Sequence, residues 1–166
     1  MTTRAPSAPE DKRDLVLRFF VAFSRFEYAM KAAGWARAGR GDAAEADWNR
    51  VVRQLKQADQ AERDRVLGRA GLLLSAPPRK QVFRNKTLSW REPGRSGDDL
   101  QRLIDGLKRV RNNLFHGGKY SPHGTYLSNR ATQLIEAAHA VLEALLDVGA
   151  LREVADRFHG YSPEEG

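Results

Sequence analysis

The sequence predicts an all-α protein, a bundle of about five helices followed by a short C-terminal helix. Three observations support this fold class. Apolar residues recur every three or four positions in successive stretches, which is the period of an amphipathic helix. Strand-forming residues gather only between residues 80 and 91. Short polar connections separate most of the helical stretches, as they do in helical bundles.

The first two helices are predicted in the N-terminal third of the chain. Residues 9–33 carry apolar side chains at helical spacing, and Gly34 follows as a stop signal. Asp42 and Glu45 have the spacing of a capping box, in which each side chain satisfies a free backbone N–H of the first turn. They predict a second helix that runs through Leu55.

The third helix precedes the one long connection of the chain. Asp59 and Glu62 repeat the capping-box spacing, and the pair Pro77-Pro78 ends the helix that they open. A connection of 20 residues, 76–95, then separates helices 3 and 4. Connections this long in compact domains are uncommon, and they tend to be functional or to contain a small hairpin.

Two further helices and a short last one complete the predicted bundle. Ser96, with an acidic residue three positions later, opens a fourth helix that runs to about His116. Ser128 caps a fifth helix, which Gly149 terminates. Residues 151–158 form the short C-terminal helix.

The 166 residues are organised as one domain with two tails. We expect residues 1–9 to be a polar, disordered tail, residues 10–159 to form the helical domain, and residues 160–166 to be a C-terminal tail. No apolar run is long enough to span a membrane, and the N-terminus lacks the pattern of a signal peptide, so we expect a cytoplasmic protein with no membrane partner. The absence of Cys excludes disulfides, thiolate zinc sites and a cysteine nucleophile.

The positive charge is concentrated in one part of the chain. The formal net charge is +7, and residues 76–120 contain 11 Lys and Arg against 4 Asp and Glu, so the rest of the chain is neutral. Arginine outnumbers lysine in this segment, and its planar fork matches phosphate oxygens. We therefore expect an anionic partner here, although a solvated surface without a ligand is an equal alternative.

The long connection has the composition of a surface that binds single-stranded nucleic acid. Phe83 and Trp90 offer stacking surfaces between basic side chains. Alternatively, Phe83, Leu88 and Trp90 only anchor the loop to the bundle. The residues expected to contact RNA, here and in the flanking helix, are Arg79, Lys80, Arg84, Lys86, Arg109 and Lys119.

Arg111 lies within the apolar stripe of the fourth helix. A guanidinium on a face directed at the core is costly unless a carboxylate, a ligand or another subunit compensates it. Glu27 lies among the apolar residues of the first helix's inner face, which include Phe20 and Phe23, and we expect it to pair with Arg111. An ion pair of this kind can also be purely structural.

His116 follows Arg111 by five positions, where the helix reaches Gly117 and Gly118. On an unbroken helix the two side chains would point about 140° apart. A two-fold partner presenting the same helix would bring two Arg and two His around one cleft, so a homodimer is expected. The alternative for His116 is a simple C-terminal helix cap.

Residues 111–116, with the sequence RNNLFH, match the R-x4-6-H signature of the HEPN superfamily, and Asn112 is the polar residue favoured directly after the arginine. The run 23–29 in the first helix also resembles bacterial HEPN proteins of the toxin and phage-defence type. The resemblance implies a HEPN-like bundle and a dimeric, metal-independent endoribonuclease without a cofactor. In it, Arg111, His116 and Asn112 are the catalytic residues, and Glu27 supports Arg111.

Cleavage of RNA needs few protein groups. The ribose 2′-OH is an internal nucleophile, so a histidine acting as base or acid and an arginine that neutralises the phosphate are sufficient. The histidines have no spacing that specifies a metal. The resemblance further implies a toxin or defence effector with an antitoxin or defence-system partner. Some HEPN toxins carry an adenylylated Tyr two residues after the His, whereas this chain has Gly118 there, which argues against that regulation.

Two other functions remain open at this level. A catalytically silent HEPN-like protein could bind RNA, a nucleotide or a partner, with Arg111 and His116 maintaining an interface. The other alternative is a helical adaptor protein without any nucleic-acid partner.

Overall fold

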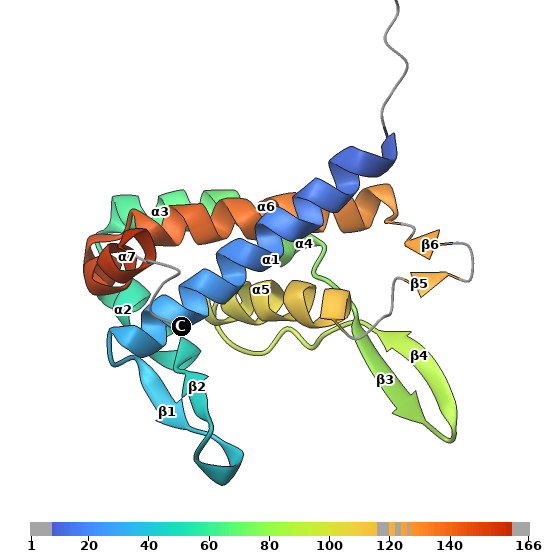
Figure 1. The fold of residues 1–166 in the computed structure, drawn as a ribbon, viewed down its shortest axis with the longest axis horizontal. Helices are drawn as coiled ribbons and strands as arrows, with labels where there is room; N and C mark the ends of the chain where they lie inside the picture. The colour runs from blue at the N-terminus through green and yellow to red at the C-terminus, as the bar shows by residue number, and fades with distance from the viewer. Residues whose placement is uncertain (1–7, 116–119, 122–123, 126, 161–166) are drawn as a thin grey trace, which may run out of the picture.

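Helices form most of the chain in the computed structural model, which describes residues 8–115, 120–121, 124–125 and 127–160 (Figure 1). Seven α-helices lie within these ranges: α1 (Ala8–Ala32), α2 (Trp48–Gln57), α3 (Gln60–Arg69), α4 (Gly71–Ser75), α5 (Asp99–Phe115), α6 (Asn129–Leu146) and α7 (Arg152–His159). There are also two short 3₁₀ turns, η1 (Arg40–Asp42) and η2 (Gly149–Leu151).

The predicted all-α fold class is wrong, because the described chain also contains three two-stranded antiparallel sheets. The strands are β1 (Ala36–Ala38) with β2 (Ala44–Ala46), β3 (Lys80–Arg84) with β4 (Thr87–Arg91), and β5 (Tyr120–Ser121) with β6 (Gly124–Thr125). The protein is thus mostly helical with added hairpins. The bundle is also not divided as predicted, since the third predicted helix is split at Ala70 into α3 and α4.

The hairpin β1–β2 replaces the predicted start of the second helix. Gly41 and Asp42 both have positive φ angles, 64° and 59°, which turn the chain back on itself. Glu45 therefore lies on β2, where its carboxylate pairs with Arg37 across the strands at 2.9 Å. The helix itself begins at Trp48. Spacing alone cannot distinguish this turn from a capping box.

The observed helix caps differ from two of the predicted ones. Asp47 caps α2, since its Oδ1 accepts a hydrogen bond from the backbone N–H of Arg50 at 3.1 Å. Asp98, rather than Ser96, caps α5 by accepting from the N–H of Gln101 at 2.9 Å. Ser128 caps α6 as predicted.

The third predicted cap is correct in position but not in chemistry. Asp59 precedes α3, yet its side chain makes no capping hydrogen bond. Glu62 Oε1 instead accepts from the backbone N–H of Gly149 at 2.8 Å, which ties α3 to the start of η2. The predicted terminator of the fifth helix, Gly149, lies beyond its end, because α6 already stops at Leu146.

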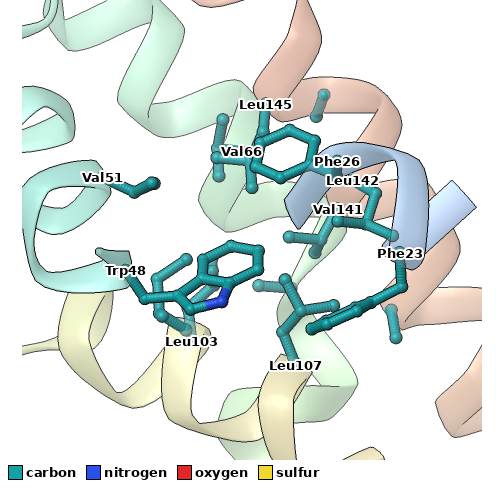
Figure 2. Close-up of a cluster of buried hydrophobic side chains, with 14 of the residues drawn as sticks. Phe23, Phe26, Trp48, Val51, Val66, Leu103, Leu107, Val141, Leu142 and Leu145 are labelled. Carbon is teal, nitrogen blue, oxygen red and sulfur yellow. The ribbon is translucent and has the colours of Figure 1, made fainter. Parts of the chain in front are cut away.

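The core lies where α1 packs along α6 and α7 while α5 packs against α2, α4 and α6 (Figure 1). Trp48 lies among α1, α5 and α6 side chains in Figure 2 and stacks on Phe26 with a centroid separation of 5.4 Å. The largest fully buried side chains are Phe19, Phe23, Phe26, Met30, Leu55, Leu73, Leu103, Ile104, Leu107, Ile135, Leu142 and Leu145. They confirm the apolar stripes predicted for the first and fourth helices.

One residue assigned to the inner face of the first helix is not in the core. Phe20 is 37% exposed and packs against Phe115 near the end of α5, with ring centroids 4.9 Å apart. Among the helices described, none is long and apolar enough to cross a membrane.

The long connection contains the hairpin β3–β4, which extends away from the helices in Figure 1. Asn85 and Lys86 form its turn, both with positive φ, as the tight turns of β-hairpins require. Phe83 and Leu88 are 70% and 60% exposed, so they do not anchor the hairpin to the bundle.

The pair between Lys56 on α2 and Asp98 at the start of α5 gives a test of stability against pH. Their side chains are 2.6 Å apart, and the hydrogen bond from Lys56, with that from the Gln101 backbone, lowers the pKa of Asp98 from 3.8. A lowered pKa means that Asp98 contributes stability above pH 3.8, which is lost as the pH falls through the folded-state pKa. Asp98→Asn keeps a good cap and removes the charge.

We expect Asp98→Asn to lower the Tm by about 1–3 °C at pH 7. The difference from the unmodified chain should close as the pH falls well below 3.8, because both chains are then uncharged at this position. Asp64→Asn, at an exposed position on α3, is the control and should change the Tm little. The measurement is thermal unfolding, followed by circular dichroism, from acidic to neutral pH. A Tm difference between Asp98→Asn and the unmodified chain that persists at the lowest pH would show that the charge of Asp98 is not its cause.

Candidate functional site

Arg111 and Glu27 form the ion pair that the sequence predicts. α5 directs Arg111 toward α1, where its Nη2 lies 3.3 Å from Glu27 Oε1. The same carboxylate oxygen accepts a hydrogen bond from Trp48 Nε1 at 2.9 Å. The guanidinium carbon also lies 5.0 Å from the centroid of the Phe23 ring, within range of a cation–π interaction. One acceptor and one aromatic face therefore fix the orientation of the guanidinium.

The pair is only partly removed from water, which differs from the buried pair expected on the apolar stripe. The exposed fractions of the two side chains are 30% for Arg111 and 27% for Glu27. Arg111 Nε is nonetheless buried, without a hydrogen-bond partner among the described residues. The guanidinium thus presents one inner edge to the protein and keeps part of its surface accessible to a ligand.

The accessible part of Arg111 lines a hollow of about 310 Å³ between α1, the β1–β2 hairpin, α2 and α5. Lys31 and Lys108 line it as well, and neither makes an ion pair with any residue that the structure describes. The acidic residues of the wall already have cationic partners, because Glu45 pairs with Arg37, Asp47 with Arg53, and Glu27 with Arg111. The hollow can therefore accept an anion such as a phosphate.

Of the other predicted catalytic residues, the structure describes only Asn112. Asn112 is exposed on α5 and turned about 100° from Arg111 around the helix axis. His116 and Lys119 lie outside the described residues. The relation between Arg111 and His116 on which the resemblance depends therefore stays a prediction.

Arg109 does not belong to the same site as Arg111. Two positions along a helix correspond to a rotation of about 200°, so the two arginines lie on opposite faces of α5. Arg109 lines a second hollow together with Arg95, Arg102 and Arg130. α5 thus carries two cationic surfaces, one on each side of its apolar stripe.

The basic residues of the hairpin have different roles. Arg79 Nε pairs with Glu92 Oε1 at 2.6 Å, and its carbonyl oxygen accepts a hydrogen bond from Asn113 Nδ2 at 2.9 Å. These contacts fasten the base of the hairpin to α5. The other basic residues of the hairpin strands and turn are exposed and have no ion pair in the described ranges: Lys80, Arg84, Lys86 and Arg91.

Several residues of these surfaces could not be assigned from the sequence. Trp48 carries an apolar ring with one N–H donor that needs a partner when buried, which is the signal that could have connected it to Glu27. Lys108 precedes Arg111 by three positions and so shares its helix face. Among the residues that the structure describes, no three His, Cys, Asp or Glu side chains are grouped as a metal site would need.

No family model, curated protein or solved structure matches the chain. The resemblance to HEPN proteins therefore rests on residues 23–29 and 111–116.

The Arg111–Glu27 pair can be measured by a double-mutant cycle. Arg111→Met keeps an unbranched apolar stem and removes the charge, and Glu27→Gln keeps an acceptor for Trp48. Since the pair is half-buried, we expect each single change to cost about 1–3 kcal/mol of unfolding free energy. The double variant should recover part of that cost, with a coupling of at least about 0.5 kcal/mol, because neither partner then leaves the other unpaired.

Chemical denaturation of the four chains supplies the free energies. Lys108→Met is the matched control: it removes a cation from the same hollow but breaks no ion pair of the described residues, so it should change stability by less than about 0.5 kcal/mol. Additive single changes, with no coupling, would show that the contact does not stabilise the fold.

Proposed function

We propose that the chain is a metal-independent endoribonuclease of the HEPN type, acting as a toxin or defence effector. The observation that supports this best is the arrangement of Arg111: its guanidinium is held by Glu27 at the wall of a hollow with two lysines that have no described counter-ion. A cation fixed before the substrate binds is what stabilisation of a phosphorane requires, because no reorganisation is needed during the reaction.

In the proposed reaction, the 2′-OH of the substrate attacks the adjacent phosphorus. His116 accepts the 2′-OH proton, the O2′–P bond forms, and the P–O5′ bond breaks. The leaving 5′-oxygen takes a proton from a second acid, which a second copy of the same histidine in a two-fold dimer can supply. Arg111 neutralises the charge on the phosphorane, and Asn112 orients the phosphate or the histidine.

Exposed apolar side chains support a homodimer. Phe115 is 54% exposed at the end of α5, close in sequence to Arg111, and it packs against Phe20. Leu17 and Val21, 59% and 45% exposed, lie one helical turn apart on α1, three positions before and one position after Phe20. Exposed apolar groups of this size favour burial against another chain. An antitoxin or another defence-system protein is the alternative occupant.

The alternative function is a catalytically silent protein that binds RNA, a nucleotide or a partner. One observation favours it: the contacts of Glu27 with Arg111 and Trp48 join α1, α5 and α2, which is also what a purely structural crosslink would do. The two functions differ in whether removing His116 affects turnover.

His116→Ala is expected to reduce RNA cleavage by about 10²–10⁴-fold while leaving the fold intact. Cleavage by the unmodified chain should persist in EDTA, should yield 2′,3′-cyclic phosphate and 5′-hydroxyl ends, and should fail on a substrate with a 2′-deoxy nucleotide at the scissile position. His159→Ala, at an exposed position near the end of α7, is the control. Gel analysis of labelled RNA, with light scattering for the oligomeric state, measures these outcomes.

Equal cleavage by the His116→Ala variant and the unmodified chain would exclude the proposed mechanism. A chain that binds RNA but never cleaves it would favour the silent alternative. The double variant, Arg111→Met with Glu27→Gln, supplies a second criterion. If it cleaves RNA as well as the unmodified chain does, Arg111 has a structural role and not a catalytic one.

The exposed hairpin residues should contribute to RNA affinity through the phosphates. Changing Lys80, Arg84 and Lys86 to Glu should weaken binding and reduce the slope of log K against log salt by about 0.7 for each phosphate of a single strand that is no longer neutralised. The matched control makes the same change of charge elsewhere, at exposed Arg65, Arg69 and Arg152. Fluorescence anisotropy over a series of salt concentrations gives the slopes of the hairpin variant and of the control. Equal slopes would show that the hairpin is a solvated surface that does not contact the RNA phosphates.

A further inference from the structure

A second cationic hollow lies on the opposite side of α5 from Arg111. It measures about 490 Å³ and is bounded by the end of α4, the segment 92–96, α5 and the first turn of α6. Four arginines from three separate parts of the chain line it: Arg95, Arg102, Arg109 and Arg130. Because these arginines are far apart in the sequence, the fold is what brings them together.

The hollow has more cationic than anionic charge available to a ligand. Its two lining carboxylates are Glu92, which already pairs with Arg79, and Asp105, which accepts a hydrogen bond from Gln101. Arg95 and Arg109 form no ion pair or hydrogen bond with the residues that the structure describes. Like charges held together in a partly enclosed space repel each other, and a bound anion removes that repulsion.

The other two arginines are held in place by the protein. Arg102 pairs with Asp99 at 2.7 Å and donates to the carbonyl oxygen of Leu74 at 3.2 Å. Arg130 Nη2 donates to the carbonyl oxygens of Ala76 and Pro77, both at 3.2 Å. Hydrogen bonds to neutral carbonyls leave the charge of Arg130 uncompensated, so it is a fixed cation in the wall.

An apolar hollow of about 270 Å³ adjoins the arginine hollow. Arg130 lines both, and the consecutive residues Pro77 and Pro78 line one each. Trp90, 40% exposed on β4, also lines the apolar hollow. The remaining apolar lining comes from α5 and α6: Val110, Leu114, Ala131, Leu134 and Ile135.

We infer that these two adjoining hollows bind one nucleotide unit, with its base against Trp90 and its phosphate among the arginines. An aromatic face beside an apolar wall suits a base, since every base has a flat π-surface that stacks. Guanidinium forks suit phosphate oxygens, which they bind by two parallel hydrogen bonds. The inference goes beyond the proposed function, because it requires neither His116 nor cleavage.

The ligand chemistry can come from an RNA strand or from a free nucleotide. A first measurement uses the full chain and a short fluorescent RNA probe that is 2′-O-methylated throughout, so that it cannot be cleaved. Arg95→Glu with Arg109→Glu should weaken binding at least about tenfold and lower the salt slope by about 0.7 for each phosphate that these arginines neutralise. Arg65→Glu with Arg69→Glu makes the same change of charge on α3 and is the control.

Trp90→Ala tests the base-binding part. It should weaken binding about tenfold without changing the salt slope, because stacking is not an interaction with phosphate. Trp90→Phe keeps an aromatic face and should recover most of the affinity, which separates stacking from any general damage to the hairpin. A Trp90→Ala variant that binds as tightly as the unmodified chain overturns the assignment of the base.

Calorimetry with small ligands distinguishes the two sources. If the hollows accept a free nucleotide, AMP should bind more tightly than adenosine or inorganic phosphate alone, whereas binding of the oligonucleotide only would assign the hollows to a strand. Equal affinity for AMP and adenosine overturns the phosphate assignment, as does a double arginine variant that behaves like its control. Tighter binding of an acidic peptide than of the probe would assign the surface to a protein instead.

These outcomes are separate from those for the proposed function. Reduced cleavage by His116→Ala with no effect of the hollow variants on the probe would contradict only the nucleotide site. Binding through the hollows by a chain that never cleaves RNA would contradict only the endoribonuclease.

Discussion

A single carboxylate oxygen on α1 accepts hydrogen bonds from two other helices, and the position of the candidate site depends on it. Glu27 Oε1 receives the Trp48 indole N–H from α2 and the Arg111 guanidinium from α5. A charge at the edge of a core is tolerated only when donors compensate it. Both donors also contact aromatic rings of α1, since Trp48 stacks on Phe26 and the Arg111 guanidinium lies over Phe23.

The helical period of α5 separates the charges of this helix into two surfaces. Its buried stripe, from Leu100 to Val110, contacts the core, so the remaining side chains must lie on one side of it or the other. Arg111 faces the hollow beside the β1–β2 hairpin, and Arg109 faces the hollow beside α4. A basic segment that is continuous in the sequence therefore contributes to two separate sites. In one, Arg111 pairs with Glu27, and in the other, Arg109 lies among further arginines.

Much of the fold was predictable because helices are encoded locally. The apolar period located α1, α5 and α6, Ser128 marked a cap, and a charge on each of two apolar faces indicated the contact of Glu27 with Arg111. The β1–β2 hairpin was not predictable in this way, since its short strands are rich in alanine, a residue with little preference for strands. The arginine hollow depends on residues far apart in the sequence, such as Arg95 and Arg130, and no local pattern connects them.

The hairpin β3–β4 has a consequence for how this protein can change over generations. Its base is fixed by Arg79, Glu92 and Asn113, while the side chains near its turn, among them Phe83 and Leu88, make little contact with the core. Substitutions near the turn therefore cost little folding stability. Selection can alter the length, charge and aromatic content of this hairpin for a new target while the helices keep their sequence, so the hairpin is where related proteins should diverge first.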